Sequence, residues 1–255
     1  MNSPKTSPWT ETLPDPLPAN PLDIAAQWLE QAQIDAAQPN PNAMVLATVD
    51  GRGQPSARVV LCKEIDAAGG AIVFYTHYES RKGRELAGNP QAAVVFHWDH
   101  RHRQVRAEGR VEPLSDAESD AYFRGRAWQS RLGAWASHQS EPVASRQALI
   151  DAIGAAARRF GIPYDGPGSV EPGAISIDIP RPARWGGFRL RVDAIELWVE
   201  GEFRIHDRAR WTRRSEQTPR GAPTADPTPS SADPTRAGGA VGAAVPEWSV
   251  TRLQP

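Results

Sequence analysis

The sequence predicts a mainly β fold, in which an antiparallel barrel carries helices on its outside. Three runs in the first half, at 43–50, 56–65 and 71–78, are rich in β-branched and aromatic residues. They are separated by "DGRGQP" and "DAAGG", which are good turn sequences. Helical segments are interspersed without a regular βαβ rhythm, which argues against a parallel doubly wound sheet and favours the antiparallel barrel.

The helices and strands follow from local patterns. Before the first strand, "NPLDIAAQWLEQAQIDA" has apolar residues at helical spacing. "SRKGRELAGNP" reads as a short helix with Ser80 as its N-cap and Gly-Asn-Pro as its stop. The runs 92–100 and 103–114 form another hairpin, and "SDAESDAYF" opens a helix through a capping box of Ser115 and Glu118. "SRQALIDAIGAAARRFG" is an amphipathic helix that ends at its glycine.

The last part of the chain returns to strands. "WGGFRLRV", "AIELWVE" and "EFRIHDRARW" predict three strands, and "PEWSVTRLQP" predicts one more at the end. Between them, Pro, Ala, Gly, Ser and Thr dominate, a composition that cannot bury enough surface to fold. The expected organisation is a flexible segment at 1–20 and a single domain at 21–255, with a disordered insertion at 214–245.

Composition excludes several classes of protein. The 255 residues carry a formal net charge of −1, so there is no global basic field for non-specific nucleic-acid binding. A single cysteine, Cys62, excludes an internal disulfide framework, and its apolar surroundings indicate a buried, inert thiol. No apolar run approaches the length of a membrane span and the N-terminus lacks a signal peptide's apolar core, so a cytoplasmic protein is expected.

The stretch "GEFRIHDRARW" places four potential cations at every second position, namely Arg204, His206, Arg208 and Arg210. Side chains alternate between the two faces of a strand, so these four are expected on one face. Like charges so close together cost free energy unless something opposes them, and an anion is therefore expected there.

Two further segments favour phosphate. "SRKGREL" begins its helix with Arg81 and Lys82, although the N-terminal end of a helix is already positive and suits an anion. "AYFRGRAWQSRLGAW" spaces Tyr122, Arg126 and Ser130 along one helix face, a set of donors that suits phosphate if Gly125 does not interrupt the helix. Each segment alone would read as polar surface, and their occurrence together favours phosphate.

Other patterns are weaker. Arg58 and Lys63 stand at the two ends of the run "RVVLCK", and a regular strand would present them on opposite faces. The cluster "HWDHRHR" offers His97, His100 and His102, but no carboxylate or cysteine pattern completes a metal site, so no metal is expected. There is no nucleophile elbow, no Walker loop and no dinucleotide fingerprint after a strand.

Nine motifs occur in an order that closely resembles the pyridoxamine (pyridoxine) 5′-phosphate oxidase family. They are "RVVLCK", "FYT", "SRKGREL", "RQVRAEG", "SRLGAWASHQS", "WGGFRL", "IELW", "FRIHDR" and the closing "RLQP". The resemblance runs from about residue 39 to 211 and resumes at 248. It implies an FMN-binding split barrel, a homodimer, and an FMN in each of two clefts between the subunits.

The resemblance also implies roles for individual residues. Those matching the flavin-binding motifs are Arg58, Val59, Val60, Leu61, Cys62, Lys63, Tyr75, Thr76, Arg81, Lys82, Gln104, Gln139, Ser140, Trp198 and Arg208. Those matching the substrate-phosphate motifs are Lys63, Tyr122, Arg126 and Ser130. Arg204 and His206 would face the substrate ring and form the catalytic pair.

The implied reaction oxidises pyridoxamine or pyridoxine 5′-phosphate to pyridoxal 5′-phosphate. A hydride passes from the substrate's 4′-carbon to the flavin, and oxygen then reoxidises the flavin and yields hydrogen peroxide. The chain lacks the family's Arg-x-x-Tyr-like N-terminal segment, which leaves two alternatives open. One is an FMN-dependent oxidase of another ring compound, such as a phenazine precursor, and the other is a non-catalytic flavin- or pyridoxal-phosphate-binding protein.

Overall fold

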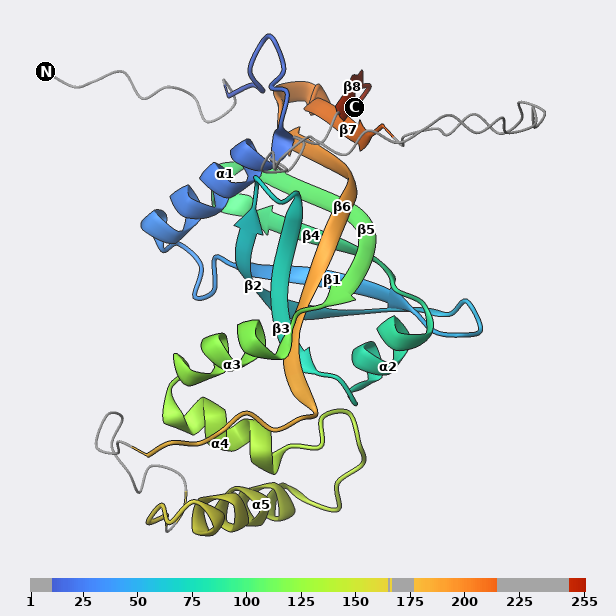
Figure 1. Ribbon diagram of the computed structural model, residues 1–255. Coiled ribbons are helices and arrows are strands. Elements are labelled where there is room, and N and C mark those ends of the chain that lie inside the picture. Colours follow the sequence, from blue (N-terminus) through green and yellow to red (C-terminus); the bar gives the residue numbers. More distant parts are fainter. Residues whose placement is uncertain (1–10, 165, 167–176, 215–247) are drawn as a thin grey trace, which may run out of the picture.

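The computed structural model describes residues 11–164, 166, 177–214 and 248–255, and its core is a closed antiparallel barrel (Figure 1). The strands are β1 (Ala43–Val49), β2 (Pro55–Asp66), β3 (Ala71–His77), β4 (Gln91–Trp98), β5 (Arg103–Pro113), β6 (Trp185–Val199), β7 (Asp207–Arg213) and β8 (Trp248–Leu253). Their order is β3-β2-β1-β4-β5-β6-β7-β8, and β3 also pairs with β6, which closes six strands into a barrel. The predicted fold class is confirmed.

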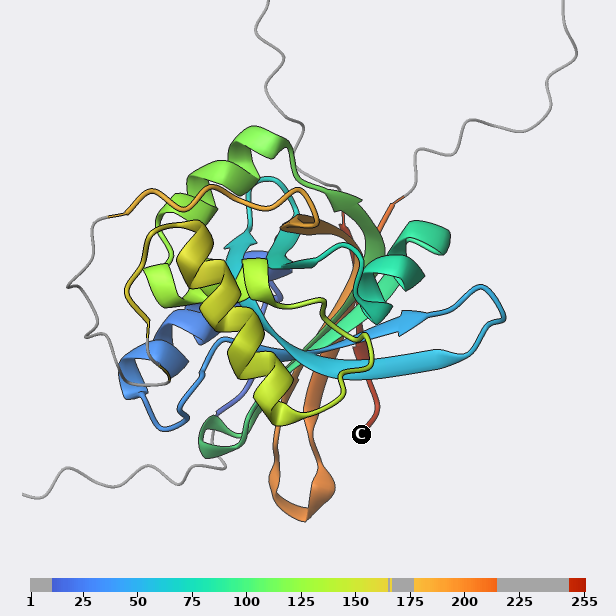
Figure 2. The ribbon, with the colours of Figure 1, turned by 90° about the horizontal axis from the view of Figure 1, so that it is seen from below.

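The described residues form five α-helices, all outside the barrel. They are α1 (Pro21–Asp35), α2 (Arg81–Gly88), α3 (Asp116–Arg124), α4 (Trp128–Ala136) and α5 (Arg146–Arg159). The capping box of α3 and the Ser80 cap of α2 are present as predicted. Helix α1 lies along one side of the barrel, whereas α3, α4 and α5 gather at one end of it (Figures 1 and 2). A small apolar cluster that includes Trp128, Leu132 and Ala157 joins α4 to α5.

Closure depends on β6, which pairs along its length with three strands. Its first part, Trp185–Arg191, pairs with β3, and its second part, Ala194–Val199, pairs with β7. Strand β5 pairs with both parts, and its register shifts between Glu108 and Gly109. Large side chains fill the interior, with Phe74, Phe96 and Trp211 at 0% exposure. Such a packed interior holds no ligand, so a site has to be built on the outside of the barrel.

The close approach of β5 and β6 at this shift requires glycine. A Cβ on Gly109 would lie 1.8 Å from the carbonyl oxygen of Arg191, a backbone atom that cannot move aside. Gly109→Ala is therefore expected to lower the free energy of unfolding by about 2 kcal/mol, as overpacking does elsewhere. Thermal unfolding followed by circular dichroism measures this loss. Gly88→Ala, where no atom lies within 4 Å, is the matched control and should unfold at or above the wild-type temperature.

Three predicted segments differ from the structure or lie outside its described residues. The predicted helix across "AYFRGRAWQSRLGAW" is two helices, because α3 ends at Arg124 and α4 begins at Trp128. Of the segment 1–20 expected to be flexible, the described residues 11–20 contact the barrel: Leu13 is 2% exposed and its N–H donates to Asp207 at 2.8 Å. The insertion expected at 214–245 lies outside the described residues, apart from Arg214.

The strand predicted at 202–211 begins later than expected. Residues Glu202–Arg204 form a 3₁₀ turn, and Phe203 and Arg204 have positive φ angles of 55° and 64°. Arg204 and His206 therefore lie on the turn before β7, and the prediction of four cations on one strand face was wrong. The turn is tight, since a Cβ on Gly201 would lie 1.9 Å from the carbonyl oxygen of Ile205.

Candidate active site

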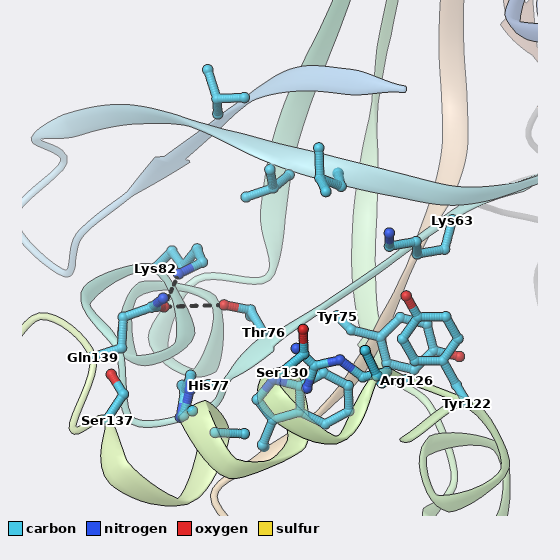
Figure 3. A pocket seen from close by; sticks show the side chains of 17 residues that line it. Lys63, Tyr75, Thr76, His77, Lys82, Tyr122, Arg126, Ser130, Ser137 and Gln139 are labelled. Atoms are coloured by element: carbon cyan, nitrogen blue, oxygen red, sulfur yellow. Dashed lines mark hydrogen bonds between the residues drawn. The ribbon is translucent and has the colours of Figure 1, made fainter. Parts of the chain in front are cut away.

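A pocket of about 620 Å³ lies between β2 and β3 of the barrel and helices α2 to α4. We call it the basic pocket (Figure 3). Its lining includes most of the residues expected to bind flavin or substrate phosphate: Val59, Val60, Leu61, Lys63, Tyr75, Thr76, Lys82, Tyr122, Arg126, Ser130 and Gln139. These residues come from five separate segments of the sequence. The structure thus brings together the segments that the motifs had suggested.

Lys82 stands at one end of the basic pocket with Gln139 and Thr76 (Figure 3). Its side-chain nitrogen donates to Oε1 of Gln139 at 2.5 Å and to the hydroxyl of Ser80 at 3.1 Å. Lys82 is only 7% exposed. Burial, together with the nearby Arg58 guanidinium, lowers the pKa of the Lys82 ammonium to about 8. A buried ammonium with two neutral partners leaves positive charge available to a bound anion.

Arg126 lies between the two ends of the pocket, and no carboxylate pairs with it among the described residues. Its guanidinium stacks over the ring of Trp185 at 4.5 Å and near Phe123 at 5.5 Å. Nη1 is buried without a hydrogen-bond partner, and burial lowers the pKa of the group. An unpaired buried donor costs free energy, so this guanidinium is suited to an incoming acceptor.

The other end of the pocket is aromatic, with Lys63 beside it (Figure 3). Tyr122 stacks on Tyr75 with ring centroids 3.8 Å apart, and Tyr75 in turn stacks on Trp185 at 5.5 Å. Burial, followed by the neighbouring Tyr122, raises the pKa of Tyr75 to about 12, so its hydroxyl remains a neutral donor. The Lys63 ammonium lies 6.0 Å from the Tyr122 ring. This end therefore offers a flat aromatic wall next to an exposed cation.

Three other expected residues, Trp198, Arg204 and His206, line a second pocket of about 700 Å³. We call it the hairpin pocket, because it lies at the turn between β6 and β7. The His206 ring packs against Trp198 at 4.8 Å, and its Nδ1 accepts a hydrogen bond from the N–H of Gly201 at 3.2 Å. That bond leaves the other ring nitrogen to face a ligand. Arg204 is exposed at the turn.

The two pockets lie at opposite ends of the barrel. Trp185 at the start of β6 lines the basic pocket, and Trp198 near its end lines the hairpin pocket. Thirteen residues of extended strand span about 40 Å. Figure 1 shows the same separation, with α3 to α5 at one end of β6 and the turn to β7 at the other. One chain therefore does not bring Arg126 and Arg204 to the same ligand.

The remaining expected residues line neither pocket, namely Arg58, Cys62, Arg81, Gln104, Ser140 and Arg208. Arg58 and Arg81 both pair with Glu85 beside the basic pocket. Arg208 pairs with Glu196 at 3.0 Å, and Gln104 lies on β5 opposite Trp198. Ser140 is exposed with a φ of 75°, directly after Gln139.

Cys62 is 1% exposed, and burial raises the pKa of its thiol to about 12, as suits the inert residue that the sequence indicated. The basic pocket also contains residues that sequence reasoning missed, above all His77, Ser137 and Trp185. His77 directly follows the "FYT" motif, which is the signal that could have drawn attention to it. Burial, followed by the charges of Arg184 and Lys82, lowers the pKa of His77 to about 4, so the ring is neutral near pH 7.

The histidine cluster near residue 100 has structural partners. His100 contacts Asp35 at 3.3 Å, and His102 contacts Glu200 at 2.8 Å. Within the described ranges, no group of three or more His, Cys, Asp and Glu side chains could hold a metal ion. In the same part of the chain, no helix combines the length and the apolar character needed to cross a membrane.

Comparison with known proteins gives these pockets a context. Residues 31–157 match the family model described as pyridoxamine 5′-phosphate oxidase, and residues 185–255 match the model of the pyridoxine 5′-phosphate oxidase C-terminal dimerisation region. A pyridoxine/pyridoxamine 5′-phosphate oxidase of Methylibium petroleiphilum is 52% identical over 196 residues, covering 77% of this chain and 84% of that protein. One of Rhizobium johnstonii is 47% identical, covering 76% and 86%.

Solved structures agree on the fold. The crystal structure of PhzG from Burkholderia lata 383, in complex with tetrahydrophenazine-1-carboxylic acid, superposes with a TM-score of 0.73 at 27% identity and covers 98% of this chain and all of that one. A pyridoxamine 5′-phosphate oxidase-related, FMN-binding protein of Nostoc punctiforme shares the fold at a TM-score of 0.59 and 15% identity, covering 92% of this chain and 97% of that one. Because relatives near 50% identity match most of both chains, this chain belongs to the pyridoxine/pyridoxamine 5′-phosphate oxidase family.

Proposed function

We propose that the protein is an FMN-dependent oxidase that converts pyridoxamine or pyridoxine 5′-phosphate to pyridoxal 5′-phosphate. The observation that carries the proposal is the half-buried guanidinium of Arg126, whose buried Nη1 has no hydrogen-bond partner, in a pocket that also contains Lys63 and Lys82. Cations without carboxylate partners inside a pocket suit phosphorylated ligands. The names of the relatives support pyridoxine and pyridoxamine 5′-phosphate as substrates, and the FMN-binding structural neighbour supports the flavin.

The residues present fit a phosphorylated flavin and a phosphorylated substrate side by side. Lys82, Thr76 and Gln139 at one end of the basic pocket would hold FMN, with Arg58 and Arg81 beside them. The substrate phosphate would be held by Lys63 and Tyr122 at the other end and by Arg126 and Ser130 between the two ends. A volume of about 620 Å³ is in the range of ordinary cofactor sites.

Bound FMN would supply the redox chemistry, taking a hydride from the substrate's 4′-carbon and passing the electrons to oxygen, which is reduced to hydrogen peroxide. The alcohol substrate would give the aldehyde directly, whereas the amine would give an imine that water hydrolyses to the aldehyde and ammonia. The chain's own residues would bind and orient. The phosphate contacts at Arg126 and Lys63 supply binding energy remote from the reacting carbon, which fixes the substrate against the flavin. Arg204 and His206 would face the substrate ring and orient it, with His206 presenting the ring nitrogen that is not bonded to Gly201.

A second copy of this chain would complete each site. The name of the C-terminal family model supports a homodimer. Apolar residues at both pockets are exposed in the single chain: Val59 is 65% exposed at the basic pocket, and Phe203 is 91% exposed beside Arg204. An interface between two chains would bury them. The hairpin pocket of one protomer would then close the basic pocket of its partner.

The rival is oxidation of a larger ring, for which the likeness to PhzG is the specific observation. The PhzG structure contains tetrahydrophenazine-1-carboxylic acid, a ligand with a carboxylate and no phosphate. The number of side-chain donors around Arg126 that suit a phosphate argues against this larger, carboxylated substrate. We expect the two substrate classes to be separable by one assay.

The assay supplies purified protein with FMN in air and with pyridoxine 5′-phosphate or pyridoxamine 5′-phosphate. Aldehyde and hydrogen peroxide should appear in equal amounts. A yellow, FMN-loaded protein that turns over neither compound would reject the proposed substrates and favour the larger ring. A protein that binds no FMN would reject the cofactor itself.

Lys82 predicts how FMN affinity depends on pH. In the empty pocket the pKa of Lys82 is about 8, and a bound phosphate dianion would raise it. Below pH 8 the ammonium is charged in both states, so affinity stays constant; above pH 8 the empty site loses its proton and binding must restore it. The dissociation constant is therefore expected to rise up to about tenfold per pH unit above 8.

Quenching of flavin fluorescence between pH 7 and 9 measures the dissociation constant of FMN. Lys82→Met should bind FMN more weakly and lose the rise in that range. Riboflavin, which lacks the phosphate, serves as the control ligand and should show no such rise in the wild-type protein. A dissociation constant for FMN that is flat from pH 7 to 9 would contradict the prediction.

A further inference from the structure

Glu85 is a buried carboxylate beside the basic pocket that no part of the proposed mechanism uses. It lies on α2 and is 6% exposed. Four side chains from three elements donate hydrogen bonds to it: Thr48 at 2.5 Å, Ser56 at 2.8 Å, Arg81 at 2.9 Å and Arg58 at 3.1 Å. Burial raises the pKa of this carboxyl, but the four hydrogen bonds outweigh burial and lower the pKa to about 2. Glu85 is thus ionised throughout the working pH range.

The geometry of the two arginines shows what this carboxylate does. Arg81 is held through Nε, so both of its terminal nitrogens remain without a partner among the described residues, and its side chain is 57% exposed. Arg58 is held through Nη2 by Glu85 and the hydroxyl of Ser56, and through Nη1 by the carbonyl oxygen of Leu46 and the hydroxyl of Thr48, which leaves Nε as its donor without a partner among the described residues. A guanidinium anchored in this way presents its remaining N–H groups in a fixed direction, which lowers the entropy lost on binding.

We propose that Glu85 is a positioning residue of the cofactor site: it fixes Arg58 and Arg81 so that they meet the phosphate of FMN next to Lys82. This inference rests on the proposed function, because it takes the phosphate of FMN as the ligand. Charge supports it. Arg58, Arg81 and Lys82 outnumber the single carboxylate by two charges, which matches the double charge of a phosphate monoester.

The sign of the effect separates positioning from simple repulsion. A negative charge close to the site repels phosphate through space, so its removal alone would strengthen FMN binding. Positioning predicts the opposite, since Glu85→Gln keeps the shape of the side chain but turns an NH₂ group towards donors. We expect Glu85→Gln to weaken FMN binding about tenfold, the effect of losing one charge-assisted contact. Riboflavin affinity should change less than about twofold, because riboflavin has no phosphate.

The experiment measures dissociation constants of FMN and riboflavin by fluorescence quenching for wild type, Glu85→Gln, Arg81→Ala and the double variant. In the Arg81→Ala background, Glu85→Gln should weaken FMN binding by only about threefold, because only Arg58 remains to be positioned. Glu85→Asp, which restores the carboxylate, should recover part of the affinity. Glu112→Gln is the matched control: it removes the same charge from an exposed pair with Arg191 and should change neither constant.

Each other outcome overturns the inference. Tighter FMN binding by Glu85→Gln would mean that repulsion dominates, and equal losses for FMN and riboflavin, or additive effects with Arg81→Ala, would mean that Glu85 only supports the fold. If Glu85→Gln does not fold, Ser56→Ala is used instead, because it removes one donor to the carboxylate. The inference then requires that Ser56→Ala weaken the binding of FMN but not that of riboflavin. Failure of the wild-type protein to prefer FMN over riboflavin would instead reject the proposed cofactor, whatever Glu85 does.

Discussion

A heterodimer of one Arg126→Ala subunit and one Arg204→Ala subunit should regain about half of the wild-type turnover, because one of its two active sites would be intact. Each variant alone should fall to about one-hundredth of wild-type turnover or less, since each loses a guanidinium that is proposed to contact the substrate. The reason is the separation of the two pockets along β6. If each site takes Arg126 from one protomer and Arg204 from its partner, one site in the heterodimer carries both changes and the other carries none.

Two different affinity tags on co-expressed chains isolate the heterodimer, and aldehyde formation with pyridoxine 5′-phosphate measures its turnover. A heterodimer of Arg126→Ala with wild type is the control, and it should also show half activity. If both arginines served the same site from one chain, the first heterodimer would contain no intact site and would stay inactive. That result would refute the shared site.

The fold could be predicted because its signals are local. The period of two in β1 to β3, the turn sequences between them and the caps at Ser80 and Ser115 act within a few residues. The pairing of β3 with β6 that closes the barrel was not predicted, since pairing between strands more than 100 residues apart leaves no local trace. Gly125 interrupts the helix pattern, and yet Tyr122, Arg126 and Ser130 still line one pocket.

The cationic run after residue 203 shows what sequence could not provide. Like charges at every second position predicted an external anion, but part of the neutralising charge lies within the chain. Register places Glu196 opposite Arg210 on β7, and Glu196 pairs with Arg208 at 3.0 Å. Arg210 in turn pairs with Glu108 at 3.0 Å. Of the four cations, Arg204 at the end of the 3₁₀ turn and His206 between that turn and β7 are the two that line the hairpin pocket.

The site was predictable as a set of residues but not as a geometry. Short motifs named Lys63, Lys82 and Arg126, which come from three separate elements and do line one pocket. No motif indicated that Arg204 would lie at the far end of the barrel, because that position depends on the whole length of β6. Glu85 gave no signal either, since a glutamate at i+4 from an arginine reads as an ordinary surface ion pair.

Arg126→Ala should raise the KM for pyridoxine 5′-phosphate about a hundredfold, since in the proposed site this guanidinium would make two charge-assisted hydrogen bonds to the substrate phosphate. The KM for unphosphorylated pyridoxine should change less than about threefold, because it makes no such bonds. Steady-state peroxide release with both compounds measures the ratio. Arg126→Lys keeps the charge but loses the planar stacking on Trp185, so an intermediate KM is expected.

Arg124→Ala is the matched control for this change. Arg124 lies two residues away, on the exposed last turn of α3 and outside the basic pocket, so its loss should leave both constants at the wild-type values. If Arg126→Ala instead raised the KM of both compounds equally, the guanidinium would support the aromatic wall of Trp185 rather than bind phosphate. The substrate would then need no phosphate, and a carboxylated ring of the kind bound by PhzG would become the stronger candidate.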